Sequence, residues 1–187
     1  VIFVRNATEG VNLVAYAWGE DNLRKGDRIV TTVLEHHSDF VPWQQLAKRV
    51  GAEVAVIDID DEGRLRQDQY ERELAKGARL VALTLTSNGL GTVTPVKRMA
   101  AQAKAVGATV LVDAAQAVPH LAVDVKDLGC DFLVFSGHKM LGPPGSGAVW
   151  GRAALLESMR PFLYGGDMIA RVGVESSTWN ELPWKFE

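Results

Sequence analysis

Short apolar runs alternate with longer amphipathic stretches along most of this chain. Six apolar runs predict strands: Val1–Val4, Ile29–Leu34, Val54–Ile57, Leu80–Thr86, Val110–Val112 and Phe132–Phe135. Four stretches between them predict helices: Glu9–Arg24, Val41–Val50, Arg66–Ala75 and Val96–Val106. The strands are continuously apolar, so we expect both faces of their sheet to be covered. The pattern predicts a three-layer α/β/α fold around a mostly parallel, mixed sheet.

Both ends of the predicted helix over 96–106 have sequence signals. Its apolar positions follow a 3.6-residue period: Val96, Met99, Ala100, Ala103 and Val106. Pro95 suits a first helical turn, and Gly107 suits the position just past the last one. The tail from Pro161 is richer in Gly, Trp and Pro, so we expect it to wrap around the sheet rather than extend it.

Composition narrows the class of protein. A chain of 187 residues is about one domain, and its opening inside a strand without Met indicates a piece of something longer. Twenty basic and 23 acidic residues give a net charge of −3 without a basic stripe, so a nucleic-acid partner is not expected. The single cysteine, Cys130, excludes an internal disulfide and fits a reducing, cytoplasmic compartment. No apolar run approaches the ~18 residues of a membrane span.

Polar side chains gather where predicted strands end, which is where open α/β sheets bind ligands. The candidates follow five of the six strands: Thr8, His36, Asn88, Asp113, Gln116, Ser136, His138 and Lys139. An amine and a carboxylate at two strand ends suit pyridoxal phosphate. Lys139 would form a Schiff base, and Asp113 would pair with the ring nitrogen.

Simpler interpretations exist for several of these residues. Thr8 is either a helix N-cap or part of a phosphate-binding helix terminus. Asn88 suits a turn, and Asp113 suits a helix cap. His36 and His37 are neighbours on an extended segment and point to opposite faces, so no metal site is predicted. One imidazole, which we assign to His36, would instead lie over an aromatic ring.

Two further features are interpreted as structural. The segment Gly142–Gly147 lacks the G-x-x-x-x-G-K-S/T spacing of a phosphate-binding P-loop. Cys130 lies at the entry to an apolar strand, and we expect a small packed residue there rather than a nucleophile.

Several segments together resemble one family. They are Arg5–Asn12, Glu35–Asp39, Val41–Trp43, Ser87–Gly91, Val112–Ala117, Phe135–Lys139, Gly165–Ile169 and Pro183–Glu187. Their order and residues are similar to those of cysteine desulfurases of the SufS type, which are class V aminotransferase-family enzymes of pyridoxal-phosphate fold type I. The Asp-x-x-Gln and Ser-Gly-His-Lys pair is specific for the family. Glu-His-His and Pro-Trp favour the SufS-type branch.

The resemblance implies roles around the cofactor ring. Lys139 would hold the cofactor and move the substrate α-proton. Asp113 would pair with the protonated ring nitrogen, and His36 would stack on the ring face. Gln116 would reach the phenolic oxygen of the cofactor.

The resemblance also implies a phosphate site. Thr8, Ser136 and His138 would bind the phosphate, and Asn88 would help to hold the cofactor or the substrate carboxylate. The chain departs from the family pattern at Ala7, Asp39 and Gly89, where relatives more often have a second hydroxyl, an asparagine and a branched residue.

The implied function is removal of sulfur from L-cysteine, which gives L-alanine and an enzyme persulfide for iron–sulfur cluster assembly. A sulfur-acceptor protein and a second copy of the enzyme are the implied partners. Selenocysteine lyase, another class V enzyme, or a non-catalytic dimerisation or binding module are the alternatives. We expect 1–187 to be the pyridoxal-phosphate-binding large domain, truncated at both ends and inactive alone, since the family's persulfide cysteine and carboxylate-binding arginine lie in a later domain.

Overall fold

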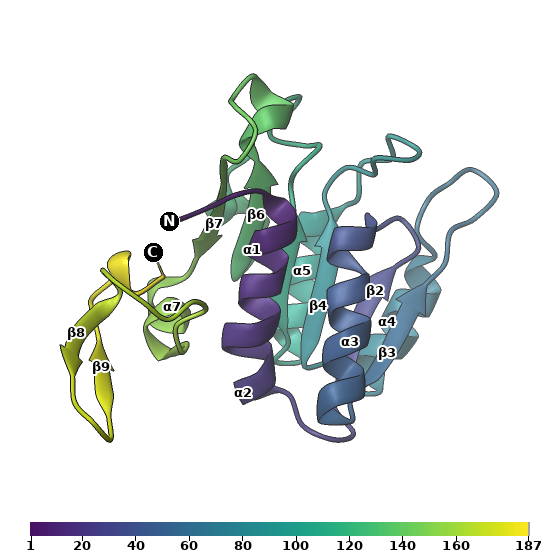
Figure 1. Cartoon of the computed structure of the whole chain (residues 1–187). Helices are drawn as coiled ribbons and strands as arrows, with labels where there is room; N and C mark the ends of the chain where they lie inside the picture. Colours follow the sequence, from purple (N-terminus) through teal and green to yellow (C-terminus); the bar gives the residue numbers. More distant parts are fainter. Residues whose placement is uncertain (187) are drawn as a thin grey trace.

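A seven-stranded mixed sheet forms the centre of the protein in the computed structural model, which describes residues 1–186 (Figure 1). The strands are β1 (Ile2–Val4), β2 (Arg28–Thr32), β3 (Glu53–Ile57), β4 (Leu80–Thr84), β5 (Thr109–Asp113), β6 (Phe132–Ser136) and β7 (Gly147–Gly151). Their order in the sheet is β1-β7-β6-β5-β4-β2-β3. Strands β2 to β6 pair in parallel, and β7 is antiparallel to both of its neighbours, β1 and β6. All strands except β7 therefore end at the same edge.

Helices cover both faces of this sheet, which confirms the predicted three layers. On one face lie α1 (Ala7–Val14), α2 (Glu20–Asn22) and α3 (Val41–Val50), and on the other lie α4 (Gln67–Ala75) and α5 (Val96–Ala105) (Figure 1). Two further helices are short: α6 (Val125–Leu128) precedes β6, and α7 (Ala153–Ser158) follows β7. None of the helices within residues 1–186 is long and apolar enough to cross a membrane.

The central strands divide their side chains between two apolar clusters. In β5, Val110 and Val112 pack in the same cluster as Met99 of α5. Leu111, between them, packs in the cluster that contains Val11 of α1. Successive strand residues point to opposite faces, so a strand covered on both sides is apolar at every position.

The first helix lies unusually close to the sheet. A Cβ atom on Gly10 would lie 2.8 Å from a methyl of Val149 and 3.0 Å from one of Val134, so only glycine allows this approach. The sequence predicts one helix over Glu9–Arg24, whereas the structure has α1, a π-helical segment at Ala15–Gly19 and α2. The predicted helical segment therefore exists, but the spacing of its apolar residues did not predict the wider π-helical turn.

Other differences concern the later part of the chain. Strand β7 was not predicted. The predicted strand Leu80–Thr86 ends at Thr84, although Thr86 forms an isolated bridge with Val93. After α7, β8 (Ile169–Val172) and β9 (Ser177–Trp179) form a separate two-stranded sheet (Figure 1). As predicted, the tail does not extend the main sheet.

Candidate functional site

The edge where the parallel strands end brings several predicted site residues together. Asp113 ends β5 and Ser136 ends the adjacent parallel strand β6. A short 3-10 helix at Gly137–Met140 follows β6 directly and contains His138 and Lys139. His138 is exposed, whereas Lys139 is half-buried. The sheet therefore places a carboxylate and an amine on neighbouring strand ends.

Asp113 is the buried acid of this edge. It is 4% exposed, and its Oδ1 accepts a hydrogen bond of 2.8 Å from the Ala115 N–H. Burial raises the pKa of Asp113, while the Ala115 N–H and the nearby charges of Lys139 and His36 lower it. Residues 114–120 form turns and no helix begins there, so the helix-cap interpretation of Asp113 is wrong.

The start of α1 reaches the same edge. Its N-cap is Asn6, whose Oδ1 accepts from the Glu9 N–H at 2.9 Å. Thr8 lies inside the helix with an exposed side chain, so the N-cap interpretation of Thr8 is wrong. The Ala7 N–H donates to Ser136 Oγ at 2.8 Å, which joins the first turn of α1 to the end of β6.

His36 is fixed by the turn that follows it. The Ser38 N–H donates to His36 Nδ1 at 3.2 Å, and Ser38 Oγ lies 2.7 Å from the same nitrogen. Because Nδ1 accepts from a backbone N–H, the neutral ring has its proton on Nε2. His37 lies beside it with a centroid separation of 5.6 Å and an angle of 46° between the rings.

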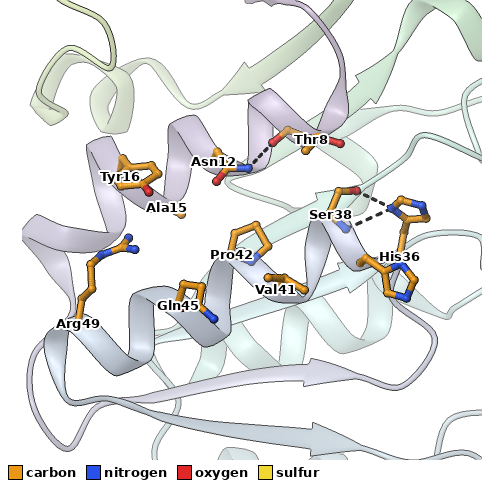
Figure 2. A pocket seen from close by; sticks show the side chains of 11 residues that line it. Thr8, Asn12, Ala15, Tyr16, His36, Ser38, Val41, Pro42, Gln45 and Arg49 are labelled. Carbon is orange, nitrogen blue, oxygen red and sulfur yellow. Dashed lines mark hydrogen bonds between the residues drawn. The ribbon is translucent and has the colours of Figure 1, made fainter.

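A groove of about 620 Å³ runs between α1 and α3 beside this edge (Figure 2). Its lining residues are Thr8, Asn12, Ala15, Tyr16, His36, His37, Ser38, Val41, Pro42, Gln45 and Arg49. Thr8 and His36 lie toward one end, and Tyr16 and Arg49 toward the other, where the Arg49 guanidinium is 4.6 Å from the Tyr16 ring centroid. Asp113 and Lys139 do not line the groove, so it adjoins the strand-end site rather than enclosing it.

Two predicted residues are placed less tightly. Asn88 is exposed in the loop after β4, where the Ser87 N–H donates to the Thr92 carbonyl at 2.9 Å, as expected for a turn. Gln116 is half-buried, and its backbone carbonyl oxygen lies 2.7 Å from His120 Nδ1. Within residues 1–186, no hydrogen bond joins either side chain to another candidate residue.

Two acids at this edge, half-buried Glu35 and fully buried Asp39, each with a buried carboxyl oxygen, had no role in the sequence prediction. Glu35 follows β2, and its Oε1 accepts from Thr32 Oγ1 at 2.6 Å. Asp39 is fully buried, and its Oδ1 accepts from Trp43 Nε1 at 2.9 Å. The sequence does contain a signal, because a Glu-x-x-x-Asp spacing across a tight turn directly after a buried strand brings two acids to one place.

The fold and the site define a three-layer α/β protein with an acid, an amine and an imidazole at its strand-end edge. Residues 1–187 match the aminotransferase class-V family, and the chain therefore belongs to that family. Enzymes of this family, cysteine desulfurases among them, use pyridoxal phosphate.

Named relatives are similar along the whole chain. A cysteine desulfurase of Haloferax volcanii is 51% identical over 187 residues, and one of Klebsiella pneumoniae (strain 342) is 51% identical over 188. The chain spans 44% and 46% of their respective lengths. Two solved structures, the cysteine desulfurase CsdA from Escherichia coli and an apo cysteine desulfurase from Thermococcus onnurineus NA1, superpose with a TM-score of 0.94 at 37% and 43% identity. All of this chain and 47% and 46% of theirs are covered.

Proposed function

We propose that residues 1–187 are the pyridoxal-phosphate-binding large domain of a cysteine desulfurase, which converts L-cysteine to L-alanine and an enzyme persulfide. The observation that supports this most is the buried carboxylate of Asp113 at the end of β5, beside the strand β6, whose following 3-10 helix contains Lys139. The names of the relatives favour this function over selenocysteine lyase, another class V activity or a non-catalytic module.

Asp113 fits the ring nitrogen of the cofactor. A buried carboxylate without a contacting cation is costly, and burial here already raises the pKa of Asp113. A protonated ring nitrogen is a cation that would compensate this charge. Gln116, half-buried three residues further on, is proposed to reach the phenolic oxygen.

The phosphate fits the start of α1. Helix N-termini bind anions through their free N–H groups and their dipole. Ser136 Oγ accepts from the Ala7 N–H, so its hydroxyl hydrogen remains available to donate to a phosphate oxygen. Thr8, in the first turn, and His138, exposed after β6, are proposed as the other donors.

The chain's own residues would divide the chemistry. When bound, pyridoxal phosphate supplies an electron sink that stabilises negative charge at the substrate α-carbon. The Lys139 amine, once deprotonated, would attach the cofactor and then hold the substrate α-proton at Nζ. His36, fixed through Nδ1 by Ser38, would cover one face of the ring and keep water from it. Asn88 would help to hold the substrate carboxylate.

The family relationship also supports coarser proposals. A sulfur-acceptor protein would receive the persulfide sulfur for iron–sulfur cluster assembly. The complete protein would act as a homodimer in the cytoplasm.

Covalent labelling tests the cofactor assignment. Borohydride reduction after incubation with pyridoxal phosphate should attach a pyridoxyl group to the peptide containing Lys139, as read by mass mapping. Lys139→Ala should abolish this label, because no other proposed group attaches the cofactor. The matched control is Lys97→Ala, at a surface lysine paired with Asp127, which should label as the wild type does. A label on a different lysine would refute the assignment.

The substrate is tested separately in the protein as it occurs in the cell. L-Cysteine should yield alanine and protein-bound persulfide in equal amounts. Turnover of L-selenocysteine without turnover of L-cysteine would instead identify the alternative activity.

A further inference from the structure

Three acids lie at the strand-end edge. Glu35 follows β2, Asp39 lies in the 3-10 turn His37–Asp39 before α3, and Asp113 ends β5. Each acid affects the charge state of another: Asp113 raises the pKa of both Glu35 and Asp39, and Glu35 raises that of Asp39. The three therefore form one electrostatic unit.

Within residues 1–186, the Glu35–Asp39 pair has polar contacts, but no cation contacts either acid. Thr32 Oγ1 donates to one oxygen of Glu35, and Trp43 Nε1 donates to one oxygen of Asp39. The second oxygens, Glu35 Oε2 and Asp39 Oδ2, are buried and have no donor among residues 1–186. A proton on one of these acids would make it a hydrogen-bond donor, whereas a carboxylate can only accept.

Electrostatics favours retention of that proton. Burial is the main cause that raises the pKa of Glu35, to about 8, and it raises the pKa of Asp39 well above its usual value. Two adjacent buried carboxylates cannot both ionise cheaply. Burial raises the pKa of Asp113 as well, but the charges of Lys139 and His36 oppose that increase. These charges favour Asp113 as the acid of the three that ionises.

We propose that Glu35 and Asp39 form a proton-holding carboxyl pair in which Asp39 donates to Glu35, leaving Asp113 as the ionised carboxylate of the site. Asp39 is then a positioning residue that acts through Glu35 and Asp113. The pair is hydrogen-bonded to the neutral Thr32 and Trp43, and the charge of Asp113 raises the pKa of both acids.

The pair would set the charge that a bound cofactor meets, and this consequence rests on the proposed function. If all three acids were ionised, the ring nitrogen would face three negative charges in a buried site. With Glu35 and Asp39 both protonated, the carboxylate of Asp113 alone faces the pyridinium charge. The existence of the pair itself does not depend on the cofactor.

Unfolding as a function of pH tests the pair in cofactor-free protein. The folded-state pKa of both acids is raised above the unfolded value, so the folded chain binds protons that the unfolded chain has released. The stabilisation is fully present below the unfolded pKa, near 4, and is lost as pH rises through about 8. Each retained proton should increase the unfolding equilibrium constant by up to about tenfold per pH unit in that window.

Variants isolate the contribution of the two acids. Asp39→Asn keeps a hydrogen-bond donor but has no titrating proton. The slope of its unfolding free energy against pH should therefore correspond to about one proton fewer released on unfolding. The double variant E35Q/D39N should lose the slope of both acids. Asp61→Asn, an exposed acid in the loop before α4, is the matched control and should keep the wild-type slope. An unchanged slope in Asp39→Asn would overturn the proposal.

Infrared spectroscopy gives a second measurement that does not require reversible unfolding. At pH 7, cofactor-free wild type should show a protonated carboxyl C=O band that is absent from E35Q/D39N and present in Asp61→Asn. A spectrum without that difference would overturn the proposal.

Cofactor affinity separates this inference from the proposed function. Asp39→Asn should bind pyridoxal phosphate within about threefold of wild type, whereas Asp39→Ala, which cannot donate, should bind about tenfold more weakly. If wild type does not bind the cofactor, the proposed function fails while the infrared result still decides the pair. If wild type binds and Asp39→Ala matches it, the positioning role fails.

Discussion

Two buried aspartates at opposite edges of the same sheet have different surroundings. Asp131, directly before β6, is 1% exposed and lies 2.7 Å from Lys104 Nζ and 3.0 Å from Arg152 Nε. It also accepts from the Val110 N–H at 2.8 Å. Asp39, at the edge where β2 and β5 end, is 0% exposed, and its Oδ1 accepts from an indole N–H.

The difference shows that burial alone does not define what an acid does. At Asp131 two cations and a backbone N–H compensate the charge, so the residue joins α5, β5 and Arg152, the residue after β7, in a structural ion pair. At Asp39 no cation from the described part of the chain is in contact, and burial favours the neutral acid. Acids of the first kind stabilise a fold, and acids of the second kind are typical of functional sites.

The largest expected effect is on cofactor binding, at Asp113 on the strand-end edge. Asp113→Ala should weaken pyridoxal phosphate binding by about 100-fold or more, because loss of one partner of a buried ion pair costs about 3–5 kcal/mol. Absorbance titration with the cofactor measures this. The unfolding free energy of the cofactor-free protein should not fall by a similar amount. Binding that stays at the wild-type level would remove Asp113 from the site.

The converse effect, a loss of stability, is expected at Asp131, which lies at the edge where β6 begins. Asp131→Ala should lower the unfolding free energy by about 3 kcal/mol, because two charged hydrogen bonds are lost and the buried Val110 N–H loses its acceptor. Urea denaturation measures it. The control is Asp127→Ala, whose pair with Lys97 is exposed and should change stability by about 0.5 kcal/mol or less. Equal losses in the two variants would break the comparison.

The smallest expected effect is at the neighbouring cysteine. Cys130 is buried, and burial raises the pKa of its thiol to about 11, which agrees with a packed residue rather than a nucleophile. Cys130→Ser should leave sulfide release from L-cysteine unchanged and lower the unfolding free energy by about 1 kcal/mol. Loss of sulfide release in a variant that still folds would show that the structural edge also takes part in the chemistry.

The sequence predicted those elements whose ends have strong local signals. The helix α3 begins and ends where predicted, with Pro42 in its first turn and Gly51 at φ 76° after its last residue. Strand β7 was missed because Gly147 and Gly151 bound it and the glycine- and proline-rich Gly142–Gly145 precedes it, a composition typical of a loop. Its strand conformation comes from pairing with β1 and β6, which local sequence does not encode.

The candidate site was predictable to the same degree. The sequence predicted that Asp113 and Lys139 would lie at one edge, because Asp113 comes at the end of one apolar strand and Lys139 shortly after another, and parallel strands end together. The Glu35–Asp39 pair was missed because its meaning depends on burial and on the absence of a contacting cation within residues 1–186. Neither property follows from residue type or spacing.

The reversed direction of β7 has a consequence for Lys139. The segment containing this lysine leaves the sheet at Ser136 and returns to the same edge at Gly147, and the Gly137 N–H donates to the Ser146 carbonyl at 2.7 Å to close the loop. A short loop held at both ends has already lost most of its conformational entropy during folding. The backbone of Lys139 is thereby held at the end of β6, so a ligand that binds at that edge meets the lysine without first ordering its loop.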